Sequence, residues 1–295
     1  MQSIEEKRIY GDRQGALEAY VSSSIGVVRV RVADDTVGEF GLCDRCTARD
    51  IASTDGAVAV ATDEDVRLIE RTDPTGNEGV TDATVSDAGF GPAVAVGADD
   101  TGLIAAGPDG EVARLPTTSV SDATDAEWTP LETDDVATVR AIDGDLVGTD
   151  AGVYRVHDGG LDHAGLTDVH DVSAAGVPLA GTEDGLYKLG NGWMEVLEGE
   201  FETVAADPQS EPGRLARANA VSGETIYAYD PDDESWMAYD HSTDPIVGVG
   251  YGRTVYAVTE RGTFLSATPE DDTGSWRSRT LGVGDVTGLA IPTPK

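Results

Sequence analysis

Lysine is almost absent from this chain: three of its 295 residues are lysine, and the other basic residues are arginine. Acidic residues number 55 against 20 basic ones, a formal net charge of −35. In molar salt such repulsion is screened within about 3 Å, and hydrated cations collect at an acidic surface. We therefore expect a protein adapted to a salt-rich, halophilic cytoplasm. Because the charge is spread along the whole chain, it also argues against nucleic acids and anionic membranes as partners.

Cysteine is equally scarce, and the two residues, Cys43 and Cys46 in "LCDRCT", are too few for a disulfide framework. Their spacing suits a metal, but structural zinc normally takes four protein ligands and no second such pair exists. We interpret them as buried free thiols, and we predict no metal and no cofactor. Long apolar runs are also missing, at the start and elsewhere, which predicts a cytoplasmic protein without a membrane segment.

No segment shows a useful 3.6-residue apolar period, which excludes a helical solenoid. A hairpin recurs instead: "DLVGTDAGVYRV" (145–156) and "PLAGTEDGLYKL" (178–189) each join two apolar strands through a tight polar turn with glycine. Weaker copies begin at residues 19, 58, 103, 217 and 255. The seven hairpins are spaced roughly 33 to 45 residues apart, and a period near 40 is typical of one four-stranded propeller blade.

Short stretches of small and apolar residues precede six of the hairpins, and we predict them to be the innermost strands, near a crowded axis. They are "RDIASTDG" (49–56), "ATVSDAG" (83–89), "TVRAIDG" (138–144), "HDVSAAG" (170–176), "TVAADP" (203–208) and "IVGVGYG" (246–252). A tryptophan follows four of the hairpins, at positions 128, 193, 236 and 276. We predict that each tryptophan opens an outer strand, where the blades diverge and leave room for a large side chain.

The two ends of the chain complete this pattern. "DVTGLAIP" (285–292) resembles an inner strand but precedes no hairpin, whereas the first hairpin has no clear inner strand of its own. We predict that the C-terminal segment supplies that strand and that the N-terminal segment adds an outer strand to the last blade, which would remove the open sheet edge. The expected fold is all-β: a single β-propeller domain over 1–295 with seven four-stranded blades, or six if the region 213–229 is irregular.

The "GTxxGhY" hairpins, in which h is an apolar residue, are followed by a tryptophan and resemble those of the BNR/Asp-box and photosystem-assembly-factor type of β-propeller. The acidic, lysine-poor composition is similar to that of a haloarchaeal β-propeller family. An Asp-box reads Ser-x-Asp-x-Gly-x-x-Trp; here Asp272, Gly274 and Trp276 follow that order with one residue fewer before the tryptophan, and "SDATDAEW" (121–128) lacks the glycine. The resemblance covers nearly the whole chain and implies an architecture, not an activity.

Candidate ligand-binding residues follow from aligning the predicted inner strands, because a propeller binds ligands where its channel opens. The alignment places acidic, basic and hydroxyl side chains at equivalent positions: Arg49, Asp50, Thr84, Thr138, His170, Asp171, Glu202 and Thr203. The competing interpretation is that they satisfy backbone groups and one another around a water-filled pore. Acidic residues in the hairpin turns could form a cation-collecting collar, although turn geometry alone requires such residues; they are Asp63, Asp65, Asp109, Asp150, Glu183, Asp184 and Glu260.

The sequence is compatible with two main classes of function. The favoured one is a non-catalytic, monomeric platform that binds a protein partner or a small ligand on the face carrying the hairpin turns. The alternative is a hydrolase or lyase at the channel mouth, with His170, Asp171 and Glu202 as its catalytic groups. A cation-dependent, lactonase-like enzyme is a third reading. The P-loop, GxGxxG, HExxH and GxSxG motifs are all missing from the sequence.

Overall fold

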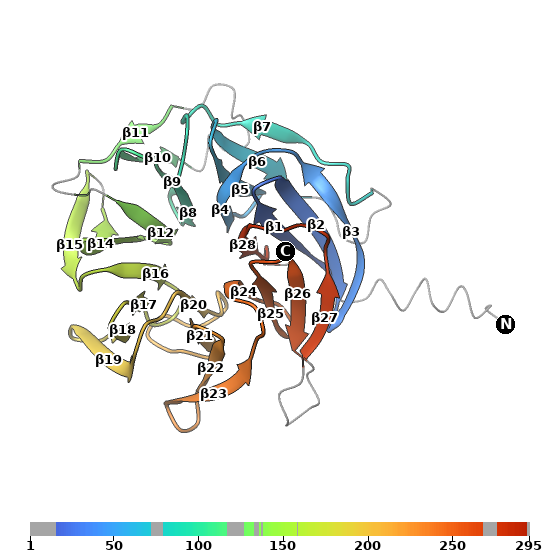
Figure 1. Ribbon diagram of the computed structural model, residues 1–295. Helices are drawn as coiled ribbons and strands as arrows, with labels where there is room; N and C mark the ends of the chain where they lie inside the picture. Colours follow the sequence, from blue (N-terminus) through green and yellow to red (C-terminus); the bar gives the residue numbers. More distant parts are fainter. Residues whose placement is uncertain are drawn as a thin grey trace.

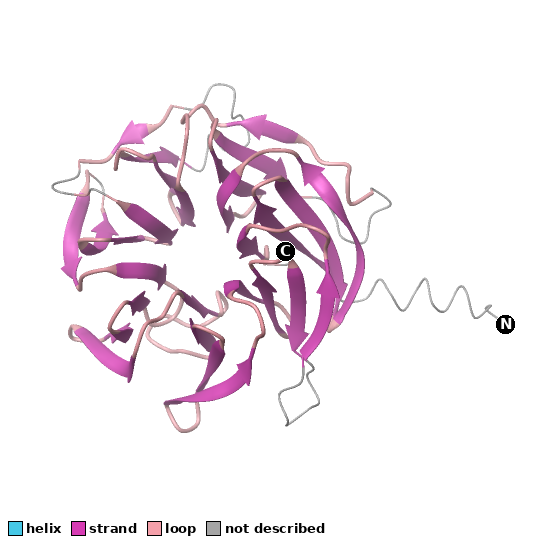
Figure 2. Ribbon diagram, in the orientation of Figure 1, coloured by secondary structure: helices cyan, strands magenta, loops and turns pink. Residues whose placement is uncertain are grey.

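Seven four-stranded antiparallel sheets stand around a central axis in the computed structural model, like the blades of a propeller (Figure 1). The structure describes residues 16–71, 79–116, 127–132, 136, 138–157, 159–267 and 276–293. Within these residues every regular element is a β-strand (Figure 2). The expected all-β propeller with seven blades is confirmed, and the region 213–229 belongs to a complete blade.

We number the blades 1 to 7 along the chain; in each, four strands run outward from the axis. The inner strands of blades 1 to 7 are β28 (Val286–Ala290), β4 (Ala48–Ser53), β8 (Ala95–Asp99), β12 (Val139–Asp143), β16 (Val169–Ser173), β20 (Thr203–Ala206) and β24 (Ile246–Tyr251). The second strands are β1 (Ala16–Ser23), β5 (Ala57–Thr62), β9 (Gly102–Ala106), β13 (Leu146–Thr149), β17 (Leu179–Thr182), β21 (Ala218–Ser222) and β25 (Val255–Thr259).

The third strands are β2 (Gly26–Ala33), β6 (Val66–Glu70), β10 (Val112–Pro116), β14 (Gly152–Val156), β18 (Gly185–Leu189), β22 (Thr225–Asp230) and β26 (Thr263–Ala267). The outer strands are β3 (Thr36–Asp44), β7 (Val85–Asp87), β11 (Thr129–Pro130), β15 (Leu161–Gly165), β19 (Trp193–Glu198), β23 (Ser235–His241) and β27 (Trp276–Thr280). All seven predicted hairpins therefore form the second and third strands of a blade.

The ring closes through the C-terminal segment. Strand β28 pairs with β1 in antiparallel register, with Tyr20 opposite Ala290 and Val21 opposite Leu289. The predicted inner strand of blade 1 is thus confirmed (Figure 1). The N-terminal segment predicted to extend blade 7 falls in residues 1–15, outside the described residues, as do Asp272 and Gly274 of the Asp-box-like sequence.

Five of the six small, apolar stretches predicted as inner strands do line the axis, and one does not. The stretch "ATVSDAG" (83–89) contains β7, the outer strand of blade 2, and the inner strand of blade 3 is β8. Two such stretches follow each other here, and only the second connects to the hairpin of blade 3 through the short turn Asp100–Thr101. The four tryptophans stand at or near the beginning of outer strands, as predicted.

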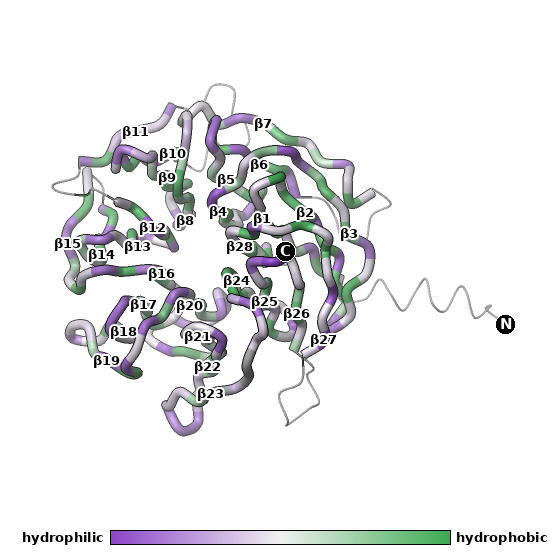
Figure 3. The backbone as a smooth tube through the Cα atoms, in the orientation of Figure 1, coloured by the Kyte–Doolittle hydropathy of each residue, from purple (hydrophilic) through white to green (hydrophobic). Residues whose placement is uncertain are grey.

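The hydrophobic core is divided among the blade interfaces. The described residues form seven clusters of buried apolar side chains, and each one joins two neighbouring blades. The cluster between blades 7 and 1, for example, combines Leu17 and Val30 with Tyr256 and Phe264. Hydrophobic segments accordingly recur within the blades, between the axis and the rim (Figure 3). Since every blade buries its faces on two neighbours, the stability of the ring depends on its closure.

Blades approach one another closely near the axis, which explains the small residues of the inner strands. A Cβ atom added to Gly97 of β8 would lie 2.5 Å from Ile142 Cγ2 and 2.7 Å from the Ile142 carbonyl oxygen of the next blade. Such distances are far below van der Waals contact, so only glycine allows this approach.

Threonine sets the geometry of the recurrent hairpin turn. Thr149 Oγ1 donates a hydrogen bond to the carbonyl of Gly152 and accepts one from the amide of Ala151 and one from that of Gly152. Thr62 and Thr182 make corresponding bonds in blades 2 and 5. The repeated "GT" at the end of a second strand thus encodes a turn stabilised by its own side chain. We call the side of the ring that carries these turns the turn face.

Candidate functional site

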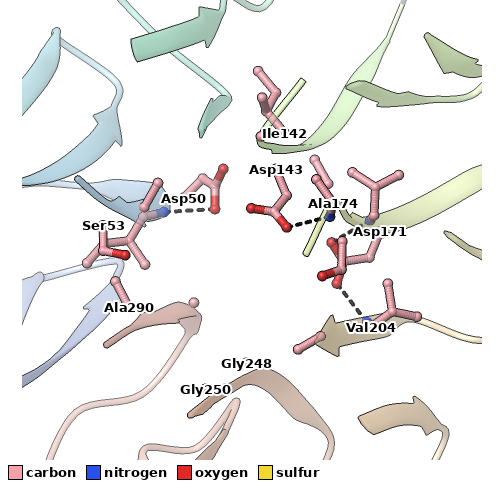
Figure 4. A pocket seen from close by; sticks show the side chains of 18 of the residues that line it. Asp50, Ser53, Ile142, Asp143, Asp171, Ala174, Val204, Gly248, Gly250 and Ala290 are labelled. Atoms are coloured by element: carbon pink, nitrogen blue, oxygen red, sulfur yellow. Dashed lines mark hydrogen bonds between the residues drawn. The ribbon is translucent and has the colours of Figure 1, made fainter. Parts of the chain in front are cut away.

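A channel follows the axis of the ring, with a volume of about 890 Å³. Residues from all seven inner strands line it. Figure 4 shows Asp50, Asp143 and Asp171 directed into this space from three different blades. Arg49 and His170, at the second positions of their inner strands, line the channel toward the turn face, and residues such as Ser53 and Ala175 line it toward the opposite face.

β-Bulges occur near the first residues of several inner strands. The register shifts at one position in β4, β12, β16 and β24, and in the pairing of β28 with β1. The extra residues are Arg49, Arg140, His170, Val247 and Thr287, and all five line the channel. A bulge redirects a side chain that regular alternation would turn away. Adjacent residues such as Arg49 and Asp50 can therefore both face the channel.

Asp50 and Asp171 connect neighbouring blades through backbone amides. In Asp50, Oδ1 accepts from the amide of Ile51 at 2.8 Å, and Oδ2 accepts from that of Val96 in the next blade at 2.9 Å. Asp171 repeats this arrangement: its oxygens accept from the amides of Val172 at 2.9 Å and of Val204, in the next blade, at 2.8 Å. Each carboxylate thereby joins the inner strands of two blades.

Asp143 makes a related connection, because its Oδ2 accepts from the amide of Ala174 in blade 5 at 2.8 Å. Burial raises the pKa of Asp50 and of Asp171 to about 7, against the opposing effect of the amide hydrogen bonds. Burial also raises the pKa of Asp143. Repulsion by Asp143 raises the pKa of Asp50, and repulsion by Asp50 and Asp143 raises that of Asp171. Near neutral pH Asp50 and Asp171, two of the six aspartates that line the channel, therefore carry less negative charge than free carboxylates.

The structure brings six of the eight predicted site residues to the channel wall. Arg49, Asp50, His170, Asp171, Glu202 and Thr203 all line it. Glu202 accepts from the amide of Gly223 at 3.0 and 3.2 Å, and Thr203 is 8% exposed. Thr84 and Thr138 do not line the channel, so their predicted positions were wrong.

The two errors have different causes. Thr84 precedes β7 at the rim, because its stretch is an outer strand. Thr138 precedes β12, and Arg140 occupies the place equivalent to His170. The connection between inner and second strands spans residues 144–145 in blade 4 but residues 174–178 in blade 5. An alignment that assumes connections of equal length therefore shifts the inner strand of blade 4 relative to that of blade 5.

Sequence reasoning did not select Arg140 or Asp143. Arg140 Nη1 donates to the carbonyl of Val169 at 3.2 Å, and Nη2 donates to Asp168 Oδ1 at 3.0 Å, so its guanidinium reaches the next blade. The available signal was the pair "VRAID" and "VHDVS", in which a basic residue follows the first valine of each inner strand. Aligning these valines would have identified Arg140.

The chemistry expected of an enzyme is only partly assembled. Among the described residues, His170 has neither a hydrogen bond nor an ion pair that would orient its ring. Asp171 and Glu202, the proposed catalytic carboxylates, already accept backbone amides. No catalytic triad is formed by these three side chains in the arrangement observed.

The acidic residues of the turns serve the backbone where the structure resolves their contacts. Asp65 accepts from the amides of Val66, Gly89, Phe90 and Gly91, and so ties the turn of blade 2 to the chain that leads into blade 3. Within the described part of the chain, no group of three or more His, Cys, Asp or Glu side chains is arranged to hold a metal ion.

Cys43 and Cys46 are free and half-buried beside the cluster between blades 1 and 2. Cys43 Sγ donates to the carbonyl of Val27 at 3.3 Å. Burial raises the pKa of Cys43 to about 11 and that of Cys46 to about 12, so both thiols stay protonated near neutral pH.

The fold and the channel define the class: a seven-bladed β-propeller with a polar axial channel and bulged inner strands. Over residues 3–292 the chain matches the model of the family described as "Beta-prop_HVO_0234:-like, beta propeller". The protein belongs to this family. No curated protein sequence matches the chain.

Several solved structures share the fold at low sequence identity. The WD40 β-propeller domain of Doa1 is 15% identical with a TM-score of 0.60, covering 80% of this chain and 83% of its own. A chain of a nidogen/laminin complex is 9% identical with a TM-score of 0.56, covering 93% and 97%. YCF48 bound to a D1 peptide is 15% identical with a TM-score of 0.53, covering 79% and 80%. No helix in the described residues is long and apolar enough to cross a membrane.

Proposed function

We propose that this protein is a non-catalytic platform that binds a protein partner or a small ligand on its turn face. The observation that carries the proposal is a chain of backbone hydrogen bonds that links the turns and inner-strand starts of blades 4 and 5 on that face. The amide of Asp150, in the turn of blade 4, donates to the carbonyl of Thr138, and the amide of Asp168 donates to the carbonyl of Asp150. The amide of Glu183 then donates to the carbonyl of Asp168. Turns and inner-strand starts thus hold one another in place.

A rigid face of this kind lowers the entropic cost of binding, because few groups must be ordered when a partner arrives. Side chains on such turns vary without disturbing the strands below them. The similar propeller YCF48 is seen with a D1 peptide, and another similar chain is part of a nidogen/laminin complex. These likenesses support a binding role, and the partner is to be identified by experiment.

The proposal includes the setting in which the protein acts. The net charge of −35 and the scarcity of lysine favour a salt-rich cytoplasm. We propose that one copy of the chain, without a cofactor, forms the whole platform, since all seven blades are completed by strands of the same chain.

Site-specific photocrosslinking tests the face that is used. A photoreactive phenylalanine analogue would replace Glu183, which is exposed in the turn of blade 5, or Asn191, which is exposed on the opposite face of the same blade. In a native extract at molar KCl, we expect the Glu183 variant to crosslink one defined partner, identified by mass spectrometry, and the Asn191 variant to give none. Crosslinks from Asn191 alone, or equally from both positions, would contradict the proposal.

A further inference from the structure

This inference rests on the proposed function and concerns the turn-face mouth of the channel. Most charges there have partners. Asp50 and Asp171 each accept hydrogen bonds from two backbone amides, and Glu202 accepts one from the amide of Gly223. Asp168 is paired with Arg140 at 3.0 Å. These four acidic side chains are therefore hydrogen-bonded or ion-paired within the protein itself.

The basic groups of the mouth are less fully used. Arg49 is exposed and, among the described residues, has no hydrogen bond and no ion pair. His170 is half-buried and equally without a partner in that part of the chain. Arg140 is held by Asp168 and Val169 at the rim of the same channel. Among the described residues that line this mouth, the charged or titratable side chains without a hydrogen bond or an ion pair are Arg49 and His170.

The bulges bring these three residues to the mouth by the same device. Arg49, Arg140 and His170 are the extra residues of β4, β12 and β16, in blades 2, 4 and 5. A bulge interrupts the ladder hydrogen bonds, and it commonly occurs where a side chain must be aimed at a site. Three bulges that each present a basic side chain to one cavity point to a ligand that attracts such groups.

We propose that the turn-face mouth of the channel binds an oxyanion, a carboxylate or a group of the same shape, through Arg49, with Arg140 and His170 as the other cationic and donor groups around it. The planar guanidinium suits such a group because it donates two parallel hydrogen bonds to its oxygens. The raised pKa values of Asp50 and Asp171 reduce the repulsion an anion meets inside the channel. The anion is either a free small molecule or a carboxylate of the bound partner.

Isothermal titration calorimetry with potassium oxalate tests the proposal, at an ionic strength held constant with KCl. Arg49→Gln is the test variant; the Arg49 side chain is exposed and has no partner among the described residues, so the fold should survive. Arg261→Gln is the control, because Arg261 lies in the turn of blade 7 on the same face, is 78% exposed and paired with Asp244 at 3.0 Å, and does not line the channel. Both changes remove one positive charge from the turn face.

We expect oxalate to bind the wild type at one site, and Arg49→Gln to weaken binding roughly tenfold, the loss expected for one charge-assisted hydrogen-bonded pair. Arg261→Gln should bind as the wild type does, and His170→Ala should weaken binding by a smaller factor. No binding to the wild type, or an equal loss in Arg49→Gln and Arg261→Gln, would overturn the proposal.

The two sources of the anion, and the two proposals, are separated by the crosslinking experiment at position 183. If oxalate suppresses the crosslink, the anion is a carboxylate of the partner; if oxalate binds while the crosslink persists, the mouth takes a free anion. A partner captured by a protein that binds no oxalate would overturn this inference and leave the platform intact. If oxalate binds specifically through Arg49 and no partner is captured, this inference stands and the proposed platform function is overturned.

Discussion

At the scale of single residues, the same side-chain type serves opposite purposes in this chain. Exposed aspartates such as Asp63 and Asp109 are solvated by salt and water, whereas Asp50 and Asp171 lie at the axis and each hold two blades together. The difference lies in their partners: Asp50 and Asp171 accept a hydrogen bond from an amide of the next blade, whereas a surface aspartate is hydrated. Arg49 and Arg140 differ in the same way, one without a partner in the described residues and one bound to Asp168.

The pH dependence of stability tests the role of Asp171. Its pKa rises from an ordinary 3.8 to about 7 on folding, so the folded protein holds a proton that the unfolded chain has lost. The resulting stabilisation is complete below about pH 4 and is lost as the pH rises to about 7. We expect the free energy of unfolding of the wild type, relative to Asp171→Asn, to fall between these pH values and to be constant above about pH 8. Denaturant unfolding at fixed KCl measures this difference, and a flat difference would contradict the assignment.

At the scale of the elements, the blade interface is the unit that stabilises the fold. Each interface has its own apolar cluster, and near the axis it depends on the absence of side-chain atoms at positions such as Gly97. Inner-strand positions at such close approaches are consequently limited to small residues, while outer strands accommodate tryptophan. Trp128 and Trp193 even donate their indole N–H groups to carbonyls of the preceding blade, of Ala88 and of Ala164.

Gly97→Ala tests the close approach of blades 3 and 4. The added methyl group would collide with Ile142, and we expect a loss of about 1–3 kcal/mol in the free energy of unfolding, as for other overpacked cores. Gly56→Ala is the control, because a Cβ atom there meets no atom within 4 Å. That change should be neutral or stabilise the protein by up to about 1 kcal/mol. Chemical denaturation of both variants measures the effect, and equal values would contradict the packing argument.

At the scale of the whole molecule, the ring closes by pairing β28 with β1, two strands from opposite ends of the chain. The closed ring gathers a net charge of −35 into one body, so self-repulsion opposes folding unless counterions screen it. The arginines are mostly engaged in local pairs such as Arg114 with Asp99, at 2.8 Å. These pairs cannot neutralise an excess of 35 acidic residues, and the solvent must supply the rest.

Unfolding midpoints measured from low to multimolar KCl test this dependence. We expect the midpoint to rise steeply with salt, because screening shortens to about 3 Å at 1 M and cations accumulate at the surface. The isolated effect of Arg49→Gln on the same series should be small, since one charge in so many changes little. A midpoint independent of KCl concentration would contradict the adaptation to salt inferred from the composition.

The sequence by itself determined the class of the fold, the seven hairpins and the closing strand. Those features are local: "GTDAG" and "GTEDG" build their turns with their own threonine and glycine, and alternation of apolar residues marks each strand whatever lies beside it. Tertiary structure decided which of two adjacent small stretches became the inner strand of blade 3, and so removed Thr84 from the site. It also decided the bulges, which aim Arg140 at the channel, and the amides that Asp143 and Asp171 accept from the next blade. The choice of inner strand, the bulges and these hydrogen bonds depend on where each strand begins and ends and on contacts between blades. Both are settled only when residues some thirty positions apart are packed around one axis.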